Sequence, residues 1–161
     1  QGLVPLLELD TGEILTQSGA IIEFLDETFP EIRLIPTDKF LAAETRALAA
    51  VITNEVQPLN NSRVLKYIRD VANFDQSQVT DWYHTWIRSG FDAVENSIKK
   101  PFCLGSAVSL VECCLIPQIY NAYRFNFDMS KYPKIENIYK LCLGLEPFQK
   151  ASPEAQPDCP K

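Results

Sequence analysis

The sequence has a single histidine, no cysteine pair spaced C-x-x-C, and no long apolar run. The five cysteines therefore lack the partner ligands that zinc sites use, and this disfavours a metal centre. A membrane-spanning helix needs about 18 apolar residues, and the longest run here covers only residues 47–52. The chain does not open with a basic segment followed by an apolar stretch, so we expect no secretory leader.

The sequence also has fewer basic than acidic residues. The 161 residues include 15 lysines and arginines against 21 aspartates and glutamates, which gives a formal net charge of −6. This acidic balance disfavours nucleic acids and anionic membranes as general partners. Cys113, Cys114 and Cys142 sit within apolar helical patterns, as expected of reduced cysteines in a cytoplasmic protein.

The chain begins at Gln1 without an initiator methionine and enters a strand-like segment almost at once. We therefore expect that further sequence precedes it. Apolar patterns over residues 4–9 and 14–16, separated by the turn cluster at residues 10–13, predict a β-hairpin. Helically spaced apolar residues follow, and Ser18 is the predicted N-cap of that helix.

The remainder of the chain has a helical pattern. Residues 1–30 are predicted to form a β-β-α unit, 31–37 a proline-flanked linker, and 38–161 an all-helical domain. The predicted fold class is therefore α+β, mostly α. A periodic run over about residues 38–68 contains Pro58, which should kink it.

Three features are predicted within the later helices. Ser109 and Glu112 have the spacing of a capping box before an apolar helix, and Pro133 should begin a further helix. The proline-containing tail from Ser152 is expected to wrap the surface or to be loose.

Several segments resemble one protein family. The match rests on the Val-Pro pair at residues 4–5 and on four segments: QSGAIIEFLDE from Gln17, QPLNNSRVLKY from Gln57, VECCLIPQIYNAYRF, and LEPFQKASPEAQPD near the end. Together they resemble the zeta class of glutathione transferases, over nearly the whole chain. The resemblance implies that residues 1–30 form the C-terminal half of a thioredoxin-like domain, followed by the family's all-helical C-terminal domain.

A serine at a helix N-terminus presents a hydroxyl and free backbone N–H groups at the positive end of the helix dipole, where carboxylates bind. The resemblance assigns Gln17 and Ser18 to the γ-glutamyl carboxylate of glutathione. It assigns the backbone of Val4, before an expected cis Pro5, to the cysteinyl part. From the residues alone, a plain helix cap and a trans proline are the more common outcomes.

The resemblance also places Gln57, Asn61, Ser62 and Arg63 in the binding site for glutathione. Arg63 and Arg124 are candidates to bind a dicarboxylate substrate, because guanidinium groups bind carboxylates through two parallel hydrogen bonds. Arg124 ends an otherwise apolar helix, which favours it as the substrate-binding residue. The alternative for each arginine is a solvated surface charge.

The implied function is glutathione-dependent cis–trans isomerisation of maleylacetoacetate to fumarylacetoacetate, in tyrosine and phenylalanine breakdown, by a homodimer. The thiolate of glutathione, the cofactor, would add to the double bond, allow rotation and then leave. The family's catalytic Ser-Ser-Cys motif is absent from the sequence, so no catalytic residue is assigned and we expect the 161-residue chain to be inactive. The alternatives are a general transferase for α-halo acids and other electrophiles, or a non-catalytic binding module.

Overall fold

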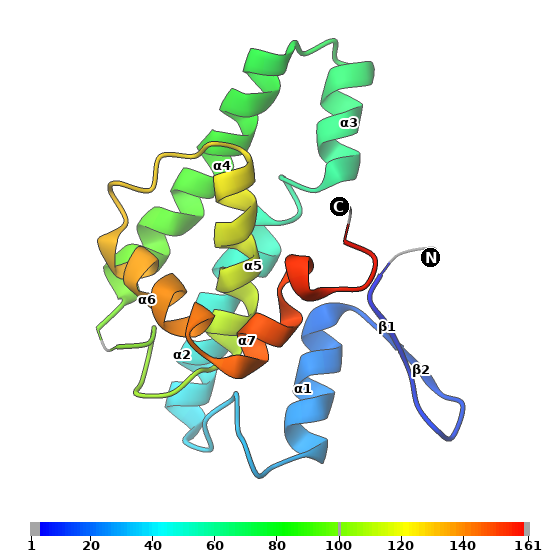
Figure 1. Ribbon diagram of the computed structural model, residues 1–161, viewed down its shortest axis with the longest axis vertical. Coiled ribbons are helices and arrows are strands. Elements are labelled where there is room, and N and C mark those ends of the chain that lie inside the picture. Colours follow the sequence, from blue (N-terminus) through cyan, green and yellow to red (C-terminus); the bar gives the residue numbers. More distant parts are fainter. Residues whose placement is uncertain (1–3, 100, 160–161) are drawn as a thin grey trace.

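A computed structural model of the chain describes residues 4–99 and 101–159. The expectation about the start of the chain concerns Gln1 and lies outside the described residues, as do the last two residues of the predicted tail. Strand β1 (Leu6–Glu8) pairs antiparallel with β2 (Ile14–Thr16) in a short hairpin. The helices that follow are α1 (Ser18–Thr28), α2 (Lys39–Ala50), a π-helix (Val51–Val56), α3 (Ser62–Asp70), α4 (Gln76–Ser97), α5 (Leu110–Arg124), α6 (Pro133–Leu143), α7 (Glu146–Ala151) and a 3-10 turn (Pro153–Ala155) (Figure 1).

The hydrophobic core lies between the helices after residue 38. Along α4, residues Val79, Tyr83, Ile87, Phe91 and Val94 are all buried. Their spacing of three and four residues places them on one face of the helix, as amphipathic packing requires. A capping box, in which Asp75 and Gln78 bond reciprocally, fixes where α4 begins.

The predicted run over residues 38–68 is not one kinked helix, and this corrects the expectation. It consists of α2, the π-helix and α3, with an irregular segment around Pro58 between the last two. The π-helix packs closely against α4 at the buried Gly90. A Cβ atom at that position would collide with Val56 of the π-helix. The absence of a side chain at Gly90 therefore allows the two backbones to approach closely.

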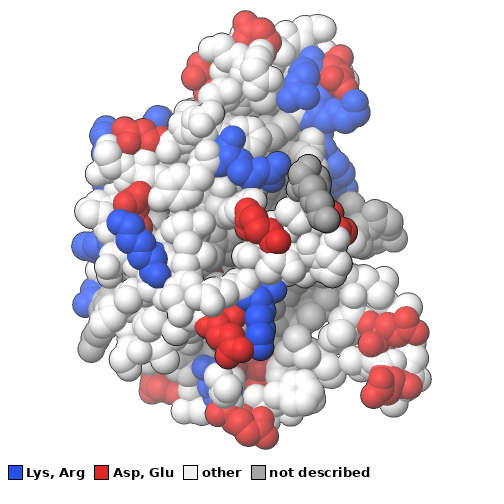
Figure 2. All heavy atoms as spheres, viewed as in Figure 1, with Lys and Arg blue, Asp and Glu red and all other residues white. Residues whose placement is uncertain are grey.

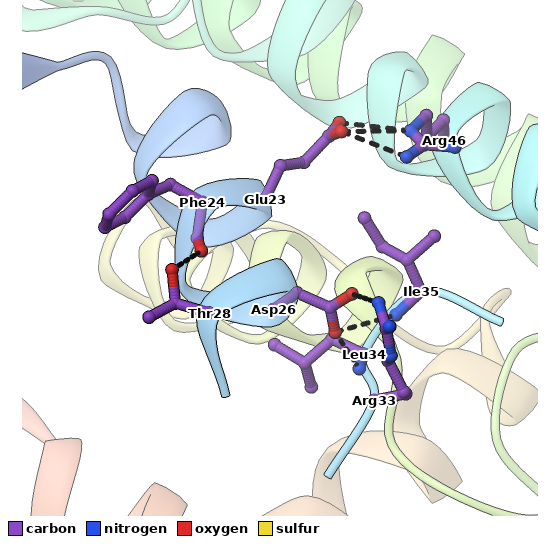
Figure 3. A network of polar contacts seen from close by, with 8 residues as sticks. All are labelled: Glu23, Phe24, Asp26, Thr28, Arg33, Leu34, Ile35 and Arg46. Carbon is purple, nitrogen blue, oxygen red and sulfur yellow. Dashed lines mark hydrogen bonds and ion pairs between the residues drawn. The ribbon is translucent and has the colours of Figure 1, made fainter. Parts of the chain in front are cut away.

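The β-β-α unit is fastened to the helices by two carboxylates of α1. Asp26 is buried and its Oδ1 accepts hydrogen bonds from the backbone N–H groups of Leu34 and Ile35, while Oδ2 pairs with Arg33 at 3.3 Å (Figure 3). Glu23 forms a two-pronged ion pair with Arg46 of α2, with the closest approach at 3.0 Å. These contacts position the N-terminus of α1 relative to the helical core.

The end of the chain packs on α5. The Tyr120 hydroxyl donates to Glu154 Oε1 at 2.7 Å, so this part of the predicted tail wraps the surface. Among residues 4–99 and 101–159, no helix is both long enough and apolar enough to cross a membrane.

Candidate functional site

Three of the predicted ligand-binding residues lie at the hairpin and the start of α1. The peptide bond between Val4 and Pro5 is cis, as expected. The hairpin pairs Leu6 with Thr16, so the strand ends next to Pro5 and to Gln17 lie side by side. Val4, Gln17 and Ser18 all lie near this end of the hairpin in the chain, and all three are exposed.

Ser18 is not the N-cap of α1, and here the structure corrects the sequence prediction. The helix begins at Ser18, the capping position is occupied by Gln17, and Gln17 makes no side-chain capping bond. Gln17 has a φ of 73°, a left-handed conformation that non-glycine residues seldom adopt. Within the described part of the chain the Ser18 hydroxyl has no hydrogen-bond partner, which leaves it available to an anion at the positive end of the helix.

The second group lies where the π-helix gives way to α3. Asn61 caps α3, since its side chain accepts a hydrogen bond from the backbone N–H of Arg63 at 3.0 Å. Asn61 and Arg63 line an open cavity of about 340 Å³. Pro58, Val64 and Tyr67 complete its walls. Gln57 is half-buried just before this cavity, and Ser62 is exposed at the first position of α3.

Arg124, the third group, is the last residue of α5 and is exposed. Its Nη1 donates to Asn121 Oδ1 at 3.5 Å, a long and weak contact. Burial raises the pKa of Tyr83, while the hydrogen bond from Gln118 and the positive charge of Arg124 oppose that rise.

The structure does not join these three groups through direct contacts. No hydrogen bond or ion pair between the described residues connects the α1 surface, the α3 cavity and Arg124. Sequence reasoning missed Tyr67 and Val64, which line the cavity with Arg63. Tyr67 lies four residues after Arg63, on the same face of the helix, and this spacing was the available signal for it.

Positive charge gathers over α3 despite the acidic balance of the chain. Arg63, Lys66 and Arg69 are all exposed on this helix, and Figure 2 shows lysine and arginine side chains clustered at the upper right, where α3 lies. Lys66 also pairs with Asp70. The α3 end of the molecule is therefore suited to attract an anionic ligand.

Four of the five cysteines are arranged for packing and not for nucleophilic attack. Burial, followed by nearby negative charge, raises the pKa of Cys113 to about 11 and that of Cys114 to about 12. The same two causes raise the pKa of Cys142 to about 12 and that of Cys103 further. These thiols are protonated at neutral pH, whereas the reactive form of cysteine is the thiolate. No group of three or more metal-ligating side chains forms a metal site among the described residues.

The chain has close relatives of known name. It is 41% identical over 159 residues to a probable maleylacetoacetate isomerase of Vibrio cholerae, covering 97% of this chain and 74% of the relative. The holo structure of maleylpyruvate isomerase, a bacterial glutathione transferase of the zeta class, matches with a TM-score of 0.94 and 37% identity. That match covers 98% of this chain and 76% of the other.

A maleylacetoacetate isomerase structure from Anaeromyxobacter dehalogenans, solved with glutathione in its active site, matches with a TM-score of 0.91 and 37% identity. It covers 99% of this chain and 75% of the other. No protein-family model matches the chain. The expected fold class, part of a thioredoxin-like domain followed by an all-helical domain, is confirmed by these structures. With 41% identity across three quarters of a relative, the chain belongs to the zeta class of glutathione transferases, the family of the maleylacetoacetate and maleylpyruvate isomerases.

Proposed function

We propose that the protein is a maleylacetoacetate isomerase that uses glutathione to convert maleylacetoacetate to fumarylacetoacetate. The observation that carries the proposal is the start of α1, where Ser18 and the first turn present donors that the described residues leave unused. A carboxylate placed there gains hydrogen bonds and the field of the helix dipole. Relatives of this chain are named as maleylacetoacetate isomerases.

In this proposal the residues divide between two ligands. Gln17 and Ser18 hold the γ-glutamyl carboxylate of glutathione, the backbone of Val4 holds its cysteinyl part, and Gln57 and Asn61 bind the rest of the cofactor. Ser62 and Arg63 extend this site at the start of α3, in the region where Asn61 and Arg63 already share a cavity.

Arg124 binds a carboxylate of the substrate. The guanidinium is exposed and makes only one weak hydrogen bond within the described structure, so it can pair with an anion at little cost. The thiolate of glutathione supplies the nucleophile and adds to the double bond. The resulting single bond rotates, and elimination of the thiolate restores the double bond in the trans form. The protein's part is to hold both anions in position during these steps. We propose that the enzyme is a cytoplasmic homodimer.

The direct test is to assay the full-length protein with maleylacetone, a cis substrate analogue, in the presence and absence of glutathione. Isomerisation that requires glutathione and leaves its concentration unchanged supports the proposal. Consumption of glutathione with an α-halo acid, without isomerisation of maleylacetone, would instead support the general transferase. Binding of glutathione without either reaction would support a non-catalytic module.

A further inference from the structure

Two consecutive residues of α4 hold the irregular segment that precedes α3. Trp82 donates from its indole Nε1 to the backbone carbonyl of Leu59 at 2.9 Å. At the next position, the carbonyl of Tyr83 accepts from the Asn60 side-chain Nδ2 at 3.1 Å. Leu59 and Asn60 lie between Gln57 and Asn61, so these two bonds fasten the backbone of the glutathione-binding segment to a buried helix.

The same part of α4 also holds the end of α5. The ring of Tyr83 stacks on Phe125 with ring centroids 3.7 Å apart and planes within 6° of parallel. His84 Nε2 lies 2.8 Å from the Phe125 carbonyl oxygen. Phe125 directly follows Arg124, so the position of the arginine backbone is set by residues 83 and 84.

Asn60 gives an independent sign that this link serves more than stability. Its Nδ2 is fixed on Tyr83, but its Oδ1 is buried and accepts no hydrogen bond within the described structure. An unpaired buried acceptor destabilises the folded state. An asparagine that carries this cost is more readily explained by positioning of a functional segment than by packing.

We propose that Trp82 and Tyr83 are positioning residues that hold the glutathione-binding segment and the substrate-binding arginine in one fixed relationship. The proposal rests on the proposed function, because it assumes that Gln57 and Asn61 bind glutathione and that Arg124 binds substrate. Helix α4 would then set the separation of the two ligands. A precise separation is what addition of one bound molecule to another requires.

The test uses one variant for each side of the link. Trp82→Phe removes the indole N–H and should raise the Kd for glutathione about threefold to tenfold, as expected for one lost hydrogen bond, without changing the KM for maleylacetone at saturating glutathione. Phe125→Leu removes the stacked ring and should raise the KM for maleylacetone by a similar factor while leaving the Kd for glutathione unchanged. Trp86→Phe is the matched control, because Trp86 touches Trp82 edge-on at 5.7 Å but does not hold the segment, and it should change neither value.

Asn60→Ala separates positioning from stability. It removes one of the two bonds together with the unpaired acceptor, so glutathione binding should weaken about threefold to tenfold while Tm stays level or rises. Wild-type Kd values in both Trp82→Phe and Asn60→Ala, or an equal loss in Trp86→Phe, would overturn the inference. Failure of the wild-type protein to bind glutathione in the same titration would instead overturn the proposed function.

Discussion

Glu112 of α5 accepts a hydrogen bond from the backbone N–H of Cys103, nine residues earlier, at 2.7 Å. Its other oxygen accepts from both the N–H and the hydroxyl of Ser109, at 2.8 and 2.7 Å. The capping box expected from the sequence is therefore present, and the same carboxylate also holds the loop before the helix. Glu112 is completely buried, so these three donors replace the water that its carboxyl group loses on folding.

Replacing Glu112 should show how much this arrangement contributes. Glu112→Ala leaves three buried donors unpaired and should lower the free energy of unfolding by about 3–5 kcal/mol. Glu112→Asp, shorter by one methylene, should keep the Ser109 bonds and lose the Cys103 bond, at about 1–2 kcal/mol. Urea denaturation measures both. Glu146→Ala, in a solvent-exposed pair with Lys150, is the control and should change stability by less than about 0.5 kcal/mol.

Two glycines should respond to alanine with opposite signs. At Gly90 a Cβ would collide with Val56 of the π-helix, so Gly90→Ala should destabilise the protein by about 1–3 kcal/mol through overpacking. At Gly19, in the first turn of α1, a Cβ meets nothing within 4 Å. Gly19→Ala should therefore stabilise the protein by up to about 1 kcal/mol. Thermal unfolding of both variants tests the pair, and equal effects would contradict the close approach at Gly90.

Ser18→Ala should raise the Kd for glutathione about tenfold or more, because a hydrogen bond to a carboxylate is lost. Thermal stability should change little, since Ser18 makes no capping bond in the structure. Titration calorimetry measures the Kd, and Ser106→Ala, in the exposed loop before α5, is the control. A Kd equal to that of the wild type would show that the Ser18 hydroxyl does not bind glutathione.

Arg124→Leu should reduce kcat/KM for maleylacetone about tenfold to a hundredfold, through loss of a charge-assisted contact. The same variant should react nearly normally with a neutral electrophile, which offers no carboxylate. Arg124→Lys should recover part of the loss, because lysine keeps the charge without the planar pair of donors. Arg88→Leu, at an exposed position of α4, serves as control. Equal losses on both substrates would show that Arg124 is structural.

The buried thiols predict a loss of stability in alkaline solution. Burial, with negative charge second, raises the pKa of Cys114 and Cys142 from the usual 9.0 to about 12 in the folded protein. The stabilisation from these protonated thiols is complete below the unfolded pKa and is lost as the pH rises through the folded pKa. The urea concentration at the unfolding midpoint should therefore decrease as the pH is raised from 9 to about 11. Cys142→Val removes one titrating group, and the decline should become shallower.

Much of the fold was predictable because local chemistry and the tertiary structure agree. The hairpin, the capping box at Ser109 and the helix start at Pro133 were all predicted, and the structure confirms them. Each depends on residues close together in sequence, whose turn or capping preferences act locally. The cis bond before Pro5 was expected from family resemblance alone.

Other features depend on contacts between distant residues. The π-helix that divides residues 38–68 approaches Gly90 closely, and Gly90 lies more than thirty positions after the start of that π-helix. Ser18 lies one position inside the helix and not at its cap, because Gln17 adopts a left-handed conformation at the end of the hairpin. No local propensity favours that conformation for glutamine.

The sequence by itself determined the mostly helical class, the family and the residue types able to bind two anions, since these depend on composition, periodicity and short motifs. Only the tertiary structure decided that Trp82 and Tyr83 link the segment before α3 to the end of α5. The physical reason is that hydrogen bonds and ring stacking act over a few ångströms in space. Their partners here are separated by 23 positions for the hydrogen bonds, a pairing that no periodic pattern in the sequence records.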